Sequence, residues 1–552
     1  MTDTLSVTET TGFTRNATGL VREVSATDAL IMNTIGMNVA VGSVFLFLQA
    51  PALFPRGSML LAVIIGTVLM AFTLLWVYSE FASAMPRSGG DYVFVSRALH
   101  PFLGWLLSWS QGIWLIFFWV GFNAWFALTF AVPVGLSTIG AATGSDGWIS
   151  LSNDLLAKHT IIGITTQWWV IGLGTLINIA FGVLLAFGGR RYWRYQKVAF
   201  AFAGGSIALV FLLLLFKGND IESAWNAFAA KNGGLTFDQI IPAAAKAGLD
   251  TSGGFSLSQT LLMLPWVFFV VGYAQGSAQI GGEVKRASTS QYRAMVGGVL
   301  INGLALALLV IVYQAAAGKE WITSLGYLGM NSPDALHLPG STLPGINLVA
   351  SLLTSNVVLL GIIGIGFVMW AVNGTPLSEL QATRYMLAWS VDRTVPQKLG
   401  EVNDRFHTPI HAIVLATLTG EAALILLTTN ANASLLGALL AQILAFIVVS
   451  AAGVAFPYRL KDIWEAGGGR RILGVPAVAL AGAGGVIALT GLLGLFLFND
   501  SINATFAATR ALSLKFMIGV VVVGSLWYLG AVLYHRNRGV SLSLAYKTIP
   551  PE

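Results

Sequence analysis

A break in an apolar helix at residues 265–288 is the first place where this sequence could bind a small molecule. The helix carries no charge from Trp266 to Val271, and it ends in a charged cluster near Glu283. Between them lie glycines and uncharged polar residues: Gly272, Tyr273, Gln275, Gly276, Ser277, Gln279, Gly281 and Gly282. Because backbone polar groups inside a bilayer need partners, a helix opens only beside protein or a polar cavity. The break therefore predicts a binding site formed from main chain, unless its small residues serve close helix packing.

A second break of the same kind lies in the first apolar span. Residues 29–45 place Gly36, Asn38, Gly42 and Ser43 between apolar flanks. Interrupted helices at corresponding places in two halves of a chain are typical of the binding sites of inverted-repeat transporters. Two such breaks bring free N–H groups and the positive ends of helix dipoles to the middle of the membrane, where they can bind a carboxylate. The carbonyl groups of the unwound turns can take an ammonium group or a cation.

Few other residues suggest chemistry. Gln111 and Trp114, in an aromatic-rich span, are candidates for a cavity wall, although such a stripe also fits helix packing. Glu421 lies inside a span, but its distance from the two breaks favours a peripheral role. No cysteine is present, and no metal-ligand spacing or hydrolase or nucleotide-binding motif occurs. We therefore expect neither an enzyme nor a protein that holds a cofactor or a metal centre.

The composition indicates an integral membrane protein. Of 552 residues, 56% are apolar and only 10% are charged, whereas a soluble domain carries about 25% charged residues. The net charge of +6 does not indicate nucleic acid binding, because the cations lie between apolar runs. About 20 apolar residues cross a bilayer, and twelve runs meet this length. They lie near 29–53, 58–82, 102–136, 161–187, 198–216, 259–281, 294–316, 347–375, 409–429, 433–456, 474–497 and 515–535.

The spans predict an all-α fold with a repeat. Spans 1–5 (29–216) and spans 6–10 (259–456) each open with a broken helix, so we expect two inverted repeats, followed by spans 11 and 12 (474–535). An even number of spans puts both chain ends on one side. Most of the 30 Lys and Arg residues fall on that side, which the positive-inside rule makes cytoplasmic. The expected cytoplasmic tails are a flexible segment 1–28 and residues 536–552.

Three motifs, in order, resemble those of the amino acid–polyamine–organocation superfamily of secondary transporters. Residues 80–101 resemble its Glu-Leu-x-x-x-x-Pro-x-Gly-Gly-x-Tyr segment, and residues 272–286 resemble its sixth-span signature ending in Gly-Glu-Val-Lys-Asn-Pro. Residues 383–396, with Thr408 and Pro409, resemble its Ser-Arg-x-x-x-Ala-x-x-x-Asp-x-x-x-Pro and Thr-Pro motifs. The resemblance covers about residues 20–460. It implies the leucine-transporter-like fold with a 5+5 inverted repeat, and amino acids or related amines as substrates.

The resemblance also implies roles for single residues. By position, Asn38, Val41, Gly42 and Ser43 would face the substrate carboxylate, Phe269 would be an aromatic gate, and Gly272 and Tyr273 would meet the amine and the side chain. We add Gln111, Trp114, Gln275 and Ser277 to this predicted substrate site.

Three departures from the family pattern bear on coupling and on the carboxylate site. The chain has Gln275 where many relatives carry a glutamate, and residues 203–206 where some proton-coupled members have a lysine. In span 1 it has Val41-Gly42-Ser43-Val44, where many relatives have Gly-Ser-Gly. The coupling ion, H⁺ or Na⁺, therefore stays open, as do uniport and exchange.

We expect secondary active transport of amino acids by alternating access in the cytoplasmic membrane. A neutral substrate fits best, because the broken helices hold no acid to neutralise a polyamine. The alternatives are a transporter of polyamines or other small organic solutes, and a substrate-sensing receptor on the same fold. The expected partners are the amino acid and the lipid bilayer, without nucleic acid.

Overall fold

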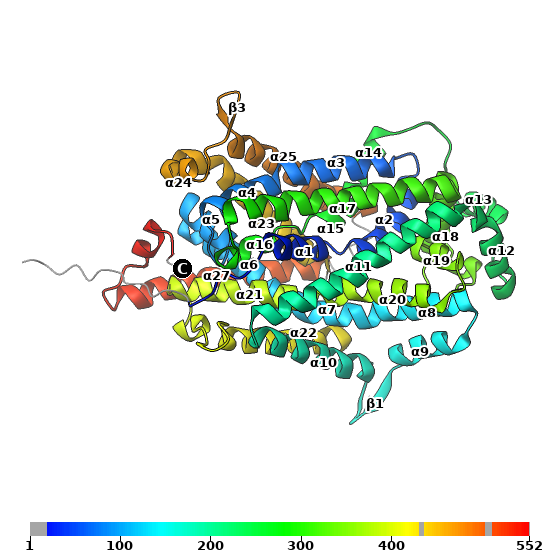
Figure 1. Cartoon of the computed structure of the whole chain (residues 1–552), viewed down its shortest axis with the longest axis horizontal. Coiled ribbons are helices and arrows are strands. Elements are labelled where there is room, and N and C mark those ends of the chain that lie inside the picture. The colour runs from blue at the N-terminus through cyan, green and yellow to red at the C-terminus, as the bar shows by residue number, and fades with distance from the viewer. Residues whose placement is uncertain (1–18, 430–434, 503–509, 551–552) are drawn as a thin grey trace, which may run out of the picture.

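A computed structural model describes residues 19–429, 435–502 and 510–550. Nearly all regular structure in these residues is helical, and most of the long helices run along the long axis of the molecule (Figure 1). Eleven helices of the described chain are long and apolar enough to cross a membrane, and the shorter apolar run Leu257–Val271 stands where the sixth span is expected. The chain is therefore an all-α membrane protein with about twelve spans.

Spans 1 to 5 and their connections comprise α1 (Ala26–Gly36), α2 (Val39–Leu53), α3 (Met59–Phe72), α4 (Leu74–Ala84), α5 (Asp91–Ala98), α6 (Pro101–Ile113), η1 (Trp114–Trp119), α7 (Val120–Phe126), η2 (Ala127–Ala131), α8 (Val132–Thr143), α9 (Asp146–Leu156), β1 (His159–Ile161), β2 (Ile164–Thr166), α10 (Trp168–Ala186), α11 (Gly189–Lys217), η3 (Gly218–Asp220), α12 (Ile221–Asn232) and α13 (Phe237–Lys246).

The remaining elements are α14 (Leu257–Leu262), α15 (Leu264–Val271), α16 (Gly276–Gln279), η4 (Gly281–Glu283), α17 (Ala287–Ala317), α18 (Lys319–Asn331), η5 (Pro333–Leu336), α19 (Ile346–Leu352), α20 (Val357–Val372), α21 (Gly374–Val391), η6 (Gln397–Gly400), α22 (Ile410–Thr429), α23 (Leu435–Arg459), α24 (Lys461–Ala466), β3 (Arg471–Ile472), β4 (Val475–Pro476), α25 (Ala477–Phe498), α27 (Arg510–Arg536) and η8 (Leu542–Lys547). The strands form two antiparallel hairpins, β1–β2 and β3–β4.

Local signals explain where key helices begin. Ser25 and Asp28 form a capping box, with the Asp28 N–H donating to Ser25 Oγ at 3.1 Å, so α1 begins at Ala26 rather than at 29. Asn356 caps α20 by accepting from the N–H groups of Val358 and Leu359. Span 8 therefore covers Val357–Val391, and the predicted range 347–375 is wrong at both ends.

Span 3 is continuous over Pro101–Thr143, although two of its segments, η1 and η2, have the wider π-helical turns. At 1.5 Å per residue it is about 65 Å long, about twice the thickness of the hydrocarbon core, so it is long enough to continue past the membrane. The connection over 317–346 holds α18, which packs on the end of α2. A Cβ at Gly326 would lie only 2.4 Å from the Leu48 carbonyl oxygen.

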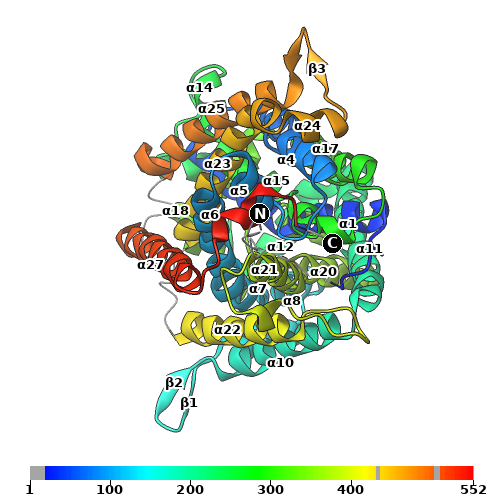
Figure 2. The same ribbon diagram turned by 90° about the vertical axis from the view of Figure 1, so that its left-hand side faces the viewer.

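Both ends of the chain as described lie at one end of the molecule. The Gly19 carbonyl oxygen is 3.3 Å from His407 Nδ1, and the Pro550 carbonyl accepts from Arg87 Nε at 2.6 Å. Residues 1–18 of the expected N-terminal tail lie outside the described residues. In the end-on view of Figure 2, α15 lies near the centre of the bundle, between α25 and α21. This part of the second broken span is thus enclosed by the other helices.

Candidate functional site

The break in span 1 is a single left-handed residue. Helix α1 ends at Gly36, Asn38 has φ 50° and ψ 52°, and α2 begins at Val39. Asparagine tolerates this conformation better than other residues with a Cβ. The Gly42 N–H donates to Asn38 O at 2.9 Å, so the first-turn N–H groups of α2 before it have no partner within the helix. The positive end of the α2 dipole therefore stands at the break.

The break in span 6 depends on a glycine. Helix α15 ends at Val271, and the Gly272 N–H donates to Phe268 O at 2.8 Å. A Cβ at Gly272 would lie 2.6 Å from that oxygen and 2.8 Å from the Phe268 ring, so no side chain fits. Residues 273–275 then form a turn before the short helix α16. This turn directs Tyr273 and Gln275 towards span 1.

A cavity of about 140 Å³ lies between the two breaks, room for roughly ten water molecules. Its lining comes from spans 1, 3, 6, 8 and 10: Ile35, Gly36, Met37, Asn38, Val41, Phe45, Gln111, Leu115, Trp119, Phe122, Asn123, Phe126, Phe269, Tyr273, Gln275, Trp370, Gly374, Leu377, Ser378, Gln381 and Gln442. No side chain in this lining is charged. The cavity is therefore suited to a ligand whose net charge is close to zero.

Several polar groups in the cavity wall lack a hydrogen-bond partner. They are Asn38 Oδ1, Gln111 Nε2, Tyr273 Oη, Gln275 Oε1 and Gln442 Nε2. Buried polar atoms are nearly always paired in folded proteins, and leaving one unpaired costs about 1–3 kcal/mol. Donors and acceptors gathered around one cavity are consequently available to a bound polar molecule.

Aromatic rings form the rest of the wall. Phe45 packs edge-on against Phe269, with ring centroids 6.3 Å apart, and stacks on Phe130 at 5.2 Å. Trp119 meets Tyr273 at 6.3 Å, also edge to face. The polar breaks and the aromatic rings together give the cavity one face for charged or polar groups and one for an apolar group.

The structure brings together more than half of the predicted site residues. Six of them line the cavity: Asn38, Val41, Gln111, Phe269, Tyr273 and Gln275. Tyr273 and Gln111 lie on different spans, so this grouping could not be read from one helix alone.

The other predicted residues do not line the cavity. Gly42 packs against Val270, and Ser43 Oγ donates to Ala40 O at 2.9 Å and borders a different cavity. Trp114 turns away from span 1 and packs on Phe516.

Ser277 and Gly272 have structural contacts instead. The Ser277 hydroxyl donates to Gln291 Oε1 at 2.7 Å and accepts from Asn33 Nδ2 at 2.8 Å, so it joins α16 to α17 and α1. Gly272 ends α15 and allows the turn described above.

Several lining residues on spans 3, 8 and 10 were not predicted from the sequence: Trp119, Asn123, Ser378, Gln381 and Gln442. Asn123 and Gln442 had a usable signal, because each is an uncharged polar side chain inside an apolar run. Ser378 and Gln381 had none, since the expected span 8 ended before them.

A buried polar network closes one side of the cavity. The Tyr385 hydroxyl donates to Asp91 Oδ1 at 2.5 Å and lies 2.9 Å from Gln111 Oε1 in the cavity wall. The Tyr78 hydroxyl donates to Asp91 Oδ2 at 2.8 Å. Burial raises the pKa of Asp91 to about 6, although the hydrogen bonds from Tyr385 and Tyr78 lower it. Span 8 and α5 are thereby tied together directly beside the cavity.

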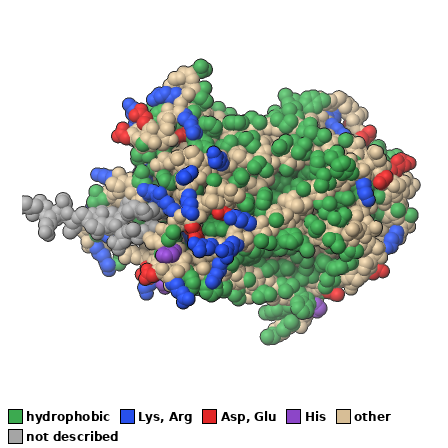
Figure 3. Space-filling view, in the orientation of Figure 1, with side chains coloured by type: hydrophobic (Ala, Val, Ile, Leu, Met, Phe, Trp, Pro, Cys, Tyr) green, Lys and Arg blue, Asp and Glu red, His purple; other side chains and the backbone are tan. Residues whose placement is uncertain are grey.

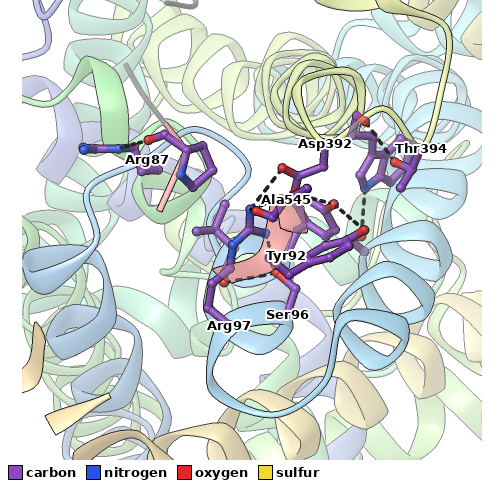
Figure 4. A network of polar contacts seen from close by, with 12 residues as sticks. Arg87, Tyr92, Ser96, Arg97, Asp392, Thr394 and Ala545 are labelled. Atoms are coloured by element: carbon purple, nitrogen blue, oxygen red, sulfur yellow. Dashed lines mark hydrogen bonds and ion pairs between the residues drawn. The ribbon is translucent and has the colours of Figure 1, made fainter. Parts of the chain in front are cut away.

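Two ion pairs lie near this network and join the same region of the fold. Arg384 on α21 makes a bidentate pair with Glu283, at 2.6 and 3.0 Å. Arg97 on α5 pairs with Asp392 at 2.8 Å, and the Ala545 carbonyl of the C-terminal segment lies 3.4 Å from the same guanidinium (Figure 4). All four ionised side chains are almost fully buried.

The comparison with known families agrees with this arrangement. A family model described as amino acid permease matches residues 24–528, a range that includes both breaks, the cavity wall and most of the last span. Since the match covers nearly the whole chain, this multi-pass membrane protein belongs to the amino acid permease family.

Proposed function

We propose that this permease is a secondary active transporter of neutral amino acids, driven by an H⁺ or Na⁺ gradient. The observation that carries the proposal is a cavity at two helix breaks whose wall has unpartnered polar groups and no charged side chain. A zwitterion needs one site for its carboxylate and another for its ammonium group, and no net countercharge.

The breaks supply these two sites. The free N–H groups of α2, beyond Asn38, can take the carboxylate at the positive end of the helix dipole. The last carbonyls of α15 and the Oε1 atom of Gln275 can accept from the ammonium group. The rings of Trp119 and Phe269 then surround an apolar side chain.

The charge distribution supports a cytoplasmic location for the end that holds both termini. In Figure 3, Lys and Arg side chains gather at that end, and a hydrophobic surface covers much of the middle of the molecule. An excess of Lys and Arg is typical of cytoplasmic loops. The proposed cycle is alternating access in the cell membrane, in which the contact of Asp91 with Tyr385 and the ion pair of Arg97 with Asp392 both open when the cavity faces the cytoplasm.

A polyamine is a poorer substrate for this cavity, because several ammonium groups would need acids in the wall. A receptor on the same fold would keep the cavity and lose net flux.

The test is uptake of radiolabelled amino acids into proteoliposomes under a proton gradient, a sodium gradient, or neither. Gradient-driven uptake of a neutral amino acid, displaced by the same unlabelled compound, is the expected result. Binding of amino acids without any flux, read as a raised melting temperature, would replace the transporter by the receptor. Uptake of polyamines alone would overturn the substrate class.

A further inference from the structure

A buried acidic side chain, Glu379, lies outside the substrate cavity, at the contact of α10, α21 and α22. Glu379 on α21 is fully buried, and its Oε1 atom accepts from the Thr417 hydroxyl on α22 at 2.6 Å. Its Oε2 atom has no hydrogen-bond partner. Burying a carboxylate with one oxygen unpaired has a high cost in free energy. Ionisable residues inside membrane helices usually serve function.

The third helix, α10, packs against this carboxyl group at Gly182, which has no side chain. A Cβ at Gly182 would lie 2.5 Å from Thr417 Oγ1 and 3.4 Å from Glu379 Oε1. One turn further along the same contact, Glu421 has both oxygens bonded, to Thr175 at 2.5 Å and to Asn178 at 3.2 Å. The two acids thus differ, because Glu421 is fully paired and half-buried, whereas Glu379 is fully buried and keeps one oxygen without a partner.

No cation neutralises Glu379 among the described residues. On α21, on the elements packed most closely against it, and at the residues that touch it from η4 and α11, the other titratable or charged groups are Asp28, Asp91, Tyr92, Arg97, Tyr192, Glu283, Arg384, Tyr385, Lys398, His411 and Glu421. The cations within this set lie elsewhere, since Arg384 pairs with Glu283 and Arg97 with Asp392, while Lys398 and His411 are exposed. The helices α6, α7, α10, α16 and α20, and η1, carry no titratable residue.

The neighbours of Glu379 in the sequence line two cavities. The preceding residue, Ser378, lines the substrate cavity. The following residue, Leu380, and Thr383 one turn later line a separate cavity of about 10 Å³, large enough for about one water molecule. That cavity reaches Thr408 and Gly189, at the end of the molecule that carries both termini. Glu379 itself lines neither cavity, and it lies on the stretch of α21 between the substrate cavity and that end of the molecule.

We propose that Glu379 is the proton-binding residue that couples amino acid transport to the proton gradient. This inference rests on the proposed transport function and names its ion. One proton adds to Oε2 and gives a neutral carboxylic acid, while Oε1 keeps the hydrogen bond from Thr417. The acid releases the proton to the other side when the helices rearrange and water reaches the site. Thr417 favours the carboxylate and so sets the pH at which release occurs.

The experiment uses proteoliposomes that contain the full chain, radiolabelled neutral amino acid, and an internal pH dye. With wild-type protein, an inward proton gradient should drive accumulation, and added amino acid should acidify the lumen. Glu379→Gln imitates the protonated acid, so it should keep amino acid exchange and lose accumulation, lumen acidification and the pH dependence of exchange.

The matched control is Glu421→Gln, which removes the paired carboxylate one turn away and should keep all three properties. Thr417→Val provides a milder second variant, since it leaves the carboxyl group in place and removes its donor. Its transport-versus-pH curve should move up by about one pH unit, the size expected for one hydrogen bond to a charged group.

The outcomes separate the two proposals. If the folded Glu379→Gln variant accumulates amino acid as wild type does, the role of Glu379 is overturned. It is also overturned if the transport-versus-pH curve of Thr417→Val coincides with that of wild type. A wild type driven by sodium alone would overturn proton coupling and leave the transporter standing. Wild-type protein that neither exchanges nor accumulates amino acids would instead refute the proposed function.

Discussion

Arg97 on α5 and Asp392 at the end of α21 are 295 residues apart in the sequence and form a buried ion pair at 2.8 Å. The Tyr92 hydroxyl donates to the same carboxylate oxygen, also at 2.8 Å. These contacts hold the connection after span 2 to the end of span 8. The two segments carry separate motifs in the sequence, and in the structure the contacts of Arg97 and Tyr92 with Asp392 hold them together.

Asp392→Asn should destabilise the protein strongly, because it leaves the Arg97 guanidinium buried beside a neutral amide. Removing one partner of a buried pair costs about 3–5 kcal/mol. Glu465→Gln, which disrupts the exposed pair with Lys461 at 3.9 Å, should cost at most about 1 kcal/mol. Thermal unfolding of the two variants in detergent measures the difference, and equal melting temperatures would contradict the prediction.

Asp91 should make stability depend on pH. Its pKa is about 6 in the folded protein, against 3.8 ordinarily, so between these values the folded state binds more protons than the unfolded chain. The free energy of unfolding should therefore fall by about 3 kcal/mol in all as pH rises from well below 4 to well above 6. Asp91→Asn should lose this component, which is read from the difference between the two melting curves across pH. A constant difference over that range would show that the site does not titrate there.

Gly42→Leu should abolish uptake by separating helices rather than by filling the cavity. A Cβ at Gly42 would meet the Val270 side chain at 2.8 Å, so a leucine there forces α2 away from α15 and displaces both breaks. Overpacking of this kind costs about 1–3 kcal/mol. Gly172→Leu on α10 is the control, because a Cβ there meets nothing within 4 Å. Uptake by Gly42→Leu equal to that of the control would exclude this explanation.

Trp119→Ala should change selectivity toward larger apolar side chains. The indole lies in the cavity wall against Tyr273, and its removal enlarges the space for the substrate side chain. Competition of a series of unlabelled amino acids against labelled uptake measures the change. Trp114→Ala is the comparison, since that ring borders a different cavity, and it should leave the order of preference unchanged. A shared change in both variants would indicate a general loosening of span 3.

The sequence predicted the breaks in spans 1 and 6, and the structure confirms both. Asn38 and Gly272 carry the signal, because their backbone conformations or contacts exclude most other residues. It could not predict which side chains reach the cavity. In span 3 the lining recurs every fourth residue, at Gln111, Leu115, Trp119 and Asn123, where the π-helical segment η1 widens the turn. Trp114 therefore lies off the lined face, although it is close to Gln111 in the sequence.

Glu379 was missed for a different reason. Residues 376–393 are polar and charged enough to read as the end of a span, and the expected span 8 stops at 375. In the structure α21 is buried along nearly its whole length, because its polar side chains face protein on all sides rather than lipid. Hydropathy reports contact with lipid, and it cannot distinguish a buried polar helix from a loop.

The docked C-terminal segment limits where a reporter can be attached. The Tyr546 ring lies 5.1 Å from the Arg97 guanidinium, and the Pro550 carbonyl accepts from Arg87. A fluorescent protein or affinity tag fused directly after this segment would pull on α5 and on the ion pair with Asp392. The β1–β2 hairpin is a better position, since Ile162 and Gly163 at its tip are exposed. A label inserted there would report on the protein without straining the contacts of Arg87, Arg97 and Asp392.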